Sequence, residues 1–132
     1  MIWFSGTLEG GMRKILLLLT LLILVGCGVT PKELRSMKPY AEFSSTKSPD
    51  FLSKCIASGL ETRSYDGIGA QVYFRPMNNG MSISTFGNIV LIDIFSEGSK
   101  TLVKYYSAYT HTWTWGKEDR INAAVQDIKS CI

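Results

Sequence analysis

The chain has 132 residues, of which 45% are hydrophobic and 19% charged, and its formal net charge is +3. This length suits a single folded domain, and the composition is that of a globular chain rather than a disordered one. The basic residues are scattered and form no run. A weak, dispersed positive charge argues against nucleic acid as a partner.

The N-terminal part holds an apolar run that follows a basic pair. Arg13 and Lys14 precede residues 15–25, which are apolar at all but one position. As a helix this run reaches about 16 Å, which is too short for the roughly 30 Å hydrocarbon core of a bilayer. A basic start followed by a short apolar run is typical of a secretory signal peptide. Residues 1–11 contain no basic residue, so we expect translation to begin at Met12.

The apolar run ends in the sequence Leu24-Val25-Gly26-Cys27. This sequence resembles the lipobox of bacterial lipoproteins, in which the cysteine thiol is acylated and the signal peptide is cut before it. The resemblance implies a signal peptide at 1–26 and a lipidated Cys27. Two or three acyl chains would hold the protein on a membrane more firmly than a single chain. The alternative is an ordinary signal peptide in which the cysteine occurs by chance.

Gly28 follows the cysteine, where some lipoproteins carry aspartate. By resemblance to enteric lipoproteins, the absence of aspartate favours the outer membrane, with the protein facing the periplasm. We predict that residues 27–48 form the lipidated cysteine and a flexible tether, because the segment contains prolines and many Ser and Thr residues. The sequence Thr30-Pro31 also fits the start of a short helical turn over residues 32–37.

The remaining segment, 49–132, is predicted to be a small periplasmic domain. Ser48-Pro49-Asp50 is typical of a helix start, because it offers a capping hydroxyl, a proline and an acidic residue in the first turn. Apolar residues then recur at helical spacing, at Phe51, Leu52, Cys55, Ile56 and Leu60. A second helical pattern covers 117–132, with Ile121, Ala124, Val125, Ile128 and Cys131 on one face.

Between these helices the pattern changes to that of β-strands. Four segments rich in β-branched and aromatic residues, separated by short Gly- and Asn-containing turns, cover 70–76, 81–86, 88–95 and 100–109. Connections this short favour antiparallel hairpins. We therefore predict an α+β two-layer sandwich with an N-terminal helix, a four-stranded antiparallel meander and a C-terminal helix, both helices lying on one face of the sheet.

Two cysteines besides Cys27 remain, and each lies on the apolar face of a predicted helix. In an oxidising periplasm, the simplest prediction for Cys55 and Cys131 is one disulfide. Two inert, buried thiols are the alternative. A metal site is disfavoured because the two thiols and the single histidine have no ligand spacing. A catalytic thiol is disfavoured because neither cysteine has a neighbour that would lower its pKa.

The sequence contains no recognisable catalytic motif. His111 is the only histidine, and no nucleophile with an orienting partner can be assigned to it. Asp93 interrupts an apolar strand, and we interpret it as a solvated or edge residue rather than as a buried functional acid. We therefore predict that the protein is not an enzyme and that it has no cofactor and no metal.

The aromatic tract "KYYSAYTHTWTWG", residues 104–116, is the most distinctive part of the domain. If it is extended, one face carries Tyr105, Tyr109, His111, Trp113 and Trp115. Exposed aromatic residues are typical of surfaces that bind glycans or proteins. The alternative is that these rings belong to the core or to a loop that wraps the domain.

These features lead to one main functional hypothesis and two alternatives. The main one is a membrane-anchored envelope lipoprotein that acts as a small interaction or accessory module and binds another envelope protein. The first alternative is a cell-wall or glycan binder that uses residues 105–115. The second is a surface-exclusion lipoprotein of the phage or plasmid type, which would block a surface receptor.

Overall fold

A computed structural model describes residues 5–23, 29–65, 68–69, 71–108 and 117–132. The helices are α1 (Ser5–Ile23), α2 (Pro31–Ser36), α3 (Pro49–Glu61) and α4 (Lys117–Lys129), with a short 3-10 turn η1 at Phe86–Asn88. The strands are β1 (Ala41–Ser45), β2 (Ser64–Tyr65), β3 (Ile68–Gly69), β4 (Val72–Met77), β5 (Gly80–Thr85), β6 (Val90–Glu97) and β7 (Lys100–Ser107).

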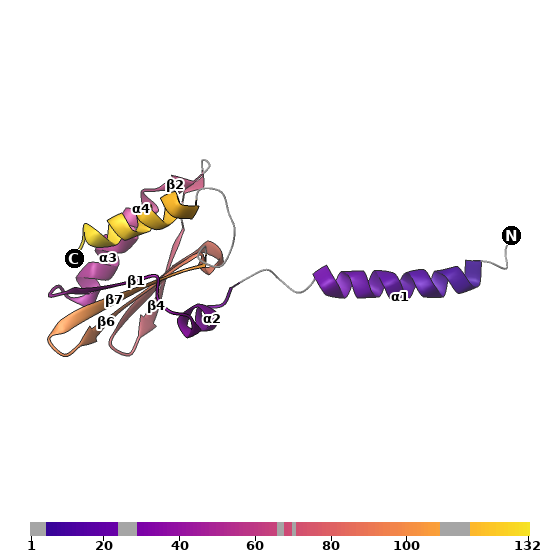
Figure 1. Cartoon of the computed structure of the whole chain (residues 1–132), viewed down its shortest axis with the longest axis horizontal. Helices are drawn as coiled ribbons and strands as arrows, with labels where there is room; N and C mark the ends of the chain where they lie inside the picture. Colours follow the sequence, from indigo (N-terminus) through magenta and orange to yellow (C-terminus); the bar gives the residue numbers. More distant parts are fainter. Residues whose placement is uncertain (1–4, 24–28, 66–67, 70, 109–116) are drawn as a thin grey trace.

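A five-stranded antiparallel sheet forms the centre of the domain, with the strand order β1-β7-β6-β5-β4 (Figure 1). Strands β4 to β7 are joined by short turns and form the predicted meander. The prediction of an α+β two-layer sandwich is confirmed, but the sheet has five strands rather than four. Strands β2 and β3 form a separate two-stranded sheet.

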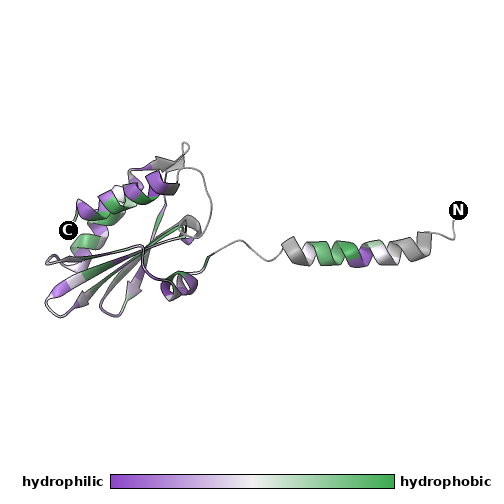
Figure 2. Cartoon of the chain, viewed as in Figure 1, coloured by the Kyte–Doolittle hydropathy of each residue, from purple (hydrophilic) through white to green (hydrophobic). Residues whose placement is uncertain are grey.

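Helices α3 and α4 cover one face of the sheet (Figure 1). The core on this face contains buried residues of both helices and of the three central strands, among them Leu52, Ile56, Ile92, Val103 and Ile128. The polar residues of α3 and α4 lie on the outer side of these helices (Figure 2). Both predicted helices are therefore present, and they share one face of the sheet as predicted.

The start of α3 follows the local signals in its sequence. The hydroxyl of Ser48 accepts a hydrogen bond from the backbone N–H of Phe51 at 3.2 Å, and Pro49 occupies the first turn. Ser48 thus satisfies one of the N–H groups that a helix leaves unpaired at its start. This cap fixes the point at which the chain leaves β1 and enters the helical layer.

Helix α2 lies on the opposite face of the sheet (Figure 1). Its only buried side chain, Leu34, is 1% exposed and packs with Leu91 of β6 and Tyr106 of β7. The hydroxyl of Thr30 caps the helix by accepting a hydrogen bond from the N–H of Glu33 at 3.2 Å. The helical turn that Thr30-Pro31 favoured is therefore present.

The prediction of a flexible tether up to residue 48 is wrong for the segment from residue 31 onward. Beyond α2, strand β1 pairs with β7 over its whole length, from Ala41 opposite Tyr105 to Ser45 opposite Thr101. Ala41 and Phe43 are partly buried against the main core. Only two apolar residues alternate in this segment, and its partner strand lies far along the chain, so the local sequence gave a weak strand signal.

Helix α1 carries exposed apolar side chains from Ile15 to Leu19. Among the residues that the structure describes, no helix combines the length and the apolar character needed to cross a membrane. Residues 24–28, which include Cys27 and the sequence that resembles a lipobox, lie outside the described residues.

Candidate functional site

Strand β4 is one edge of the five-stranded sheet, and within the described chain it pairs only with β5. The direction in which its backbone N–H and C=O groups point follows from the pairing of β5 with β6 and of β4 with β5. The N–H of Ser96 donates to the carbonyl of Asn79 at 2.9 Å, so residue 79 faces β6. Because hydrogen-bonding directions alternate along a strand, residues 81 and 83 also face β6, and residues 80, 82 and 84 face β4.

The register between β4 and β5 then shows which backbone N–H and C=O groups of β4 point toward β5 and which point away from the sheet. Residues 80, 82 and 84 are opposite Met77, Arg75 and Tyr73, which therefore bond to β5. The backbone groups of residues 72, 74 and 76 point away from the sheet. This exposed edge offers the N–H and C=O of Val72 and Phe74 and the C=O of Pro76, which has no N–H. Pro76 thus occupies an outward position, where its missing donor costs the sheet no hydrogen bond.

Two large aromatic side chains flank this edge. Tyr73 and Phe74 are each 48% exposed, and as neighbours in a strand they point to opposite faces of the sheet. Arg75 is also exposed. An edge whose outward backbone groups pair with no other strand of the described chain, and which carries exposed aromatic side chains, can accept a further strand. We call residues 72–76 the β4 edge.

A polar cluster lies on the α2 face of the sheet. Asp93 of β6 is 4% exposed, and Arg35 of α2 holds both of its oxygens, with Nε to Oδ2 at 2.8 Å and Nη2 to Oδ1 at 2.9 Å. The same Nη2 donates to the hydroxyl of Ser82 at 3.0 Å. This two-point geometry joins α2 to two strands of the sheet. We call Arg35, Asp93 and Ser82 the α2 clamp.

The pKa values of Arg35 and of the nearby Tyr106 are both raised. Hydrogen bonding of the Arg35 guanidinium to the Asp93 carboxylate raises the pKa of Arg35, and burial of the guanidinium opposes this effect. Burial also raises the pKa of Tyr106 above its ordinary value of 10.0, and the negative charge of Asp93 adds to this rise. Arg35 therefore remains a cation, and Tyr106 remains protonated at neutral pH.

The interpretation of Asp93 as a solvated or edge residue is wrong. Asp93 lies on the middle strand of the sheet and is buried because α2 supplies the guanidinium that compensates its charge. Sequence reasoning missed Arg35, which lies in the segment predicted to be a tether. The only signal was an aspartate inside an apolar strand, which required a basic partner somewhere in the chain.

The predicted aromatic binding face is not supported at Tyr105. This residue is 0% exposed and belongs to the main core, where its ring meets that of Tyr40 edge-on at 5.8 Å between centroids. It faces α3 and α4 because it lies opposite Ala41 and Ile92, which point to the helical layer. The other members of this predicted face, Tyr109, His111, Trp113 and Trp115, lie outside the described residues.

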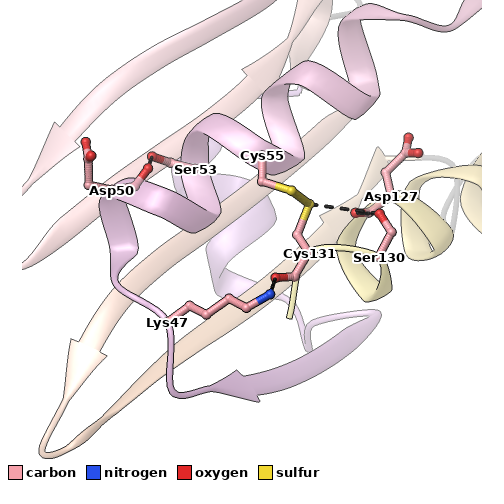
Figure 3. Close-up of a disulfide and its surroundings, with 7 residues drawn as sticks. All are labelled: Lys47, Asp50, Ser53, Cys55, Asp127, Ser130 and Cys131. Atoms are coloured by element: carbon pink, nitrogen blue, oxygen red, sulfur yellow. Dashed lines mark hydrogen bonds between the residues drawn. A yellow bond between two sulfur atoms is a disulfide. The ribbon is translucent and has the colours of Figure 1, made fainter.

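Cys55 and Cys131 form a disulfide, as predicted (Figure 3). The bond joins α3 to the residues that follow α4, and the two Cα atoms are 5.9 Å apart. Next to it, the amine of Lys47 donates to the carbonyl of Cys131 at 2.7 Å. Together these contacts fasten the C-terminal segment to α3 and to the chain just after β1.

Within the described part of the chain, no three His, Cys, Asp or Glu residues are grouped so that they would hold a metal ion. Comparison of the chain with models of protein families, with curated proteins and with solved structures gives no match.

Proposed function

We propose that this chain is a lipid-anchored protein of the bacterial envelope whose domain binds another envelope protein by strand addition at the β4 edge. The anchor is Cys27, and the bound partner is an extended segment. The observation that carries the binding proposal is the set of outward backbone groups between the exposed rings of Tyr73 and Phe74.

The anchor is supported by the N-terminal sequence. The basic pair, the short apolar run and Leu24-Val25-Gly26-Cys27 resemble the signal peptide and lipobox of lipoproteins. The disulfide between Cys55 and Cys131 suits an oxidising compartment such as the periplasm. With Gly28 after the cysteine, we place the anchor in the outer membrane, with the domain facing the periplasm.

The chemistry of the β4 edge limits the partner. A strand paired there would accept hydrogen bonds from the backbone N–H groups of Val72 and Phe74. It would receive none from Pro76, which has no N–H. The partner segment would be short, with an apolar side chain beside Phe74 and an acidic one beside Arg75. Alternating side-chain pockets of this kind provide specificity, and the backbone hydrogen bonds provide affinity.

Binding fits the polar groups of the domain better than catalysis does. Asp93 is buried on the α2 face of the sheet, and both of its oxygens accept hydrogen bonds from Arg35. This carboxylate therefore anchors a helix, and it is not presented to a substrate. Glycan binding through residues 105–115 is less favoured, because Tyr105 lies in the core.

Site-specific photocrosslinking in intact cells tests strand addition. A photoreactive phenylalanine analogue at position 73 should capture a partner. Position 40 is the matched control, because Tyr40 is equally exposed, at 49%. The analogue at position 40 should capture no partner, since this residue precedes β1, the strand at the other edge of the sheet. Phe74→Pro is the decisive variant. It removes an outward N–H without removing a hydrogen bond to β5 and should abolish capture at position 73.

The outcomes separate strand addition from other contacts. Equal capture in the Phe74→Pro variant would contradict hydrogen bonding through the β4 edge. Equal capture from positions 73 and 40 would mean that the contact is not specific to this edge. The melting temperature of Phe74→Pro should stay close to that of the unmodified protein, because Pro76 already shows that this strand accepts proline in an outward position.

The anchor has its own test. Cys27→Ser should abolish labelling by a radioactive fatty acid and leave the precursor uncut, because in the family that the sequence resembles both steps depend on this thiol. A mature N-terminus at any residue other than 27 in the unmodified protein would refute the anchor and leave the β4 edge untouched.

A further inference from the structure

We infer that the anchored domain has no free tether and lies directly against the phosphate headgroups of the bilayer, with the sheet end that holds Val29, Asn88 and Ala108 facing the lipid. This inference rests on the lipid anchor of the proposed function. It adds the orientation of the domain, and therefore the location at which a partner must be found.

The covalent distance between anchor and domain is short. Only two peptide units separate Cys27 from Val29. At no more than about 3.6 Å per residue, the Cα of Val29 lies within about 7 Å of the acylated residue. Acyl chains on the thiol hold Cys27 at the level of the headgroups. Val29 must therefore lie at the membrane surface as well.

Val29 is already part of the fold. Its carbonyl accepts a hydrogen bond from the side-chain amide of Asn88 at 2.9 Å, and its side chain packs on the cluster of Leu34, Leu91 and Tyr106. Ala108 packs on the same cluster. The chain thus joins the domain at residue 29, where the loop before β6 and the end of β7 meet.

The next segment cannot act as a hinge while the domain is intact. Thr30 caps α2, and Leu34 is buried between α2 and the sheet. Arg35 donates hydrogen bonds to Asp93 and Ser82. To swing away from the lipid, the domain would have to release α2, which exposes Leu34 and leaves Asp93 without its cation. The α2 clamp therefore transmits the position of the anchor to the whole sheet.

One end of the sheet lies next to Val29, where the chain from the anchor joins the domain, and the other end lies far from it. Val90 begins β6 next to Asn88, and β6 then runs for eight residues to the Gly98–Ser99 turn. At about 3.3 Å per residue, this turn lies roughly 26 Å from the attached end. Lys32, exposed in the first turn of α2, is close to the attachment and carries a cation that suits a phosphate headgroup.

Fluorescence quenching by brominated lipid tests this orientation. The acylated protein is reconstituted in vesicles of phosphatidylethanolamine and phosphatidylglycerol, with an environment-sensitive label on Lys32→Cys or, as the matched control, on Ser99→Cys. Both positions are exposed, and position 32 lies in the short helix α2 and position 99 in the turn between β6 and β7. Brominated lipid should quench the label at position 32 several-fold more strongly than the label at position 99. Inserting a long Gly/Ser linker after Gly28 should remove this difference, because the domain then moves freely.

The failure of the orientation can be distinguished from that of the anchor. Mass spectrometry of the N-terminal peptide first establishes acylation of Cys27, and an unmodified cysteine would refute both proposals. With acylation present, equal quenching at positions 32 and 99 would overturn the orientation alone. Unchanged quenching at position 32 after linker insertion would also overturn it, because the short connection would then not be its cause.

Discussion

Arg35 of α2 and Asp93 of β6 are 58 positions apart in the chain and are joined by two hydrogen bonds of 2.8 and 2.9 Å. This pair brings α2, which begins four residues after Cys27, onto the central strand of the sheet. Because the Asp93 side chain is 6% exposed and that of Arg35 is 34% exposed, water screens the pair only in part. Its contribution should therefore exceed that of an ion pair at the surface.

Arg35→Met should lower the free energy of unfolding by about 2 to 3 kcal/mol, because it leaves a buried carboxylate without its partner. Lys54→Met is the matched control, since Lys54 pairs with Asp50 at 3.1 Å and both side chains are 74% exposed. This control should cost less than about 0.5 kcal/mol. Urea denaturation of both variants measures the difference, and equal losses would show that α2 is not held by the clamp.

Alkaline pH should destabilise the domain through Tyr106, whose pKa is raised in the folded state. The folded protein keeps this proton to a higher pH than the unfolded chain does. The stabilising effect is therefore complete below the ordinary pKa of 10.0 and is lost as pH rises through the folded pKa. Melting temperatures of the unmodified protein and of Tyr106→Phe should therefore diverge as the pH rises above the ordinary tyrosine pKa of 10.0, with the smaller decrease in the variant. Parallel curves would assign the alkaline loss to other groups.

Reducing the disulfide between Cys55 and Cys131 should destabilise the domain strongly. The bond closes a loop with a sequence separation of 76, and the chain-entropy model gives about 4.5 kcal/mol for a loop of this size. Thiol counting in denaturant without reductant should find neither cysteine free in protein produced in an oxidising compartment. The Cys55→Ser/Cys131→Ser double variant should reproduce the low melting temperature of the reduced protein. A double variant as stable as the oxidised protein would contradict this account.

Gly80 should tolerate no side chain, because a Cβ at this position would lie 1.8 Å from the carbonyl oxygen of Ile94. Gly80→Ala must push β5 away from β6 and should cost about 3 kcal/mol or more. Gly98→Ala is the control: its φ is +61°, but its Cβ would meet nothing within 4 Å. Backbone strain alone should cost about 1 to 2 kcal/mol there. Thermal unfolding compares the two, and an equal loss would exclude the close approach as the cause.

The sequence by itself determined the elements whose signals are local. The cap at Ser48 and the helical spacing of apolar residues predict α3, and alternation between short turns predicts β4 to β7. Because each signal lies within a few residues of the structure it specifies, it needs no knowledge of the rest of the chain. The disulfide between Cys55 and Cys131 was also predicted, because only these two cysteines remain besides Cys27 and each lies on the apolar face of a predicted helix.

The tertiary structure alone decided which strand each segment meets and which face of the sheet is covered. Strand β1 becomes a strand by pairing with β7, and Asp93 becomes buried only because Arg35 arrives from α2. Tyr105 enters the core because its side of β7 faces α3 and α4. Alternation along a strand separates two faces but does not say which face is solvated, since burial depends on elements that are distant in the sequence.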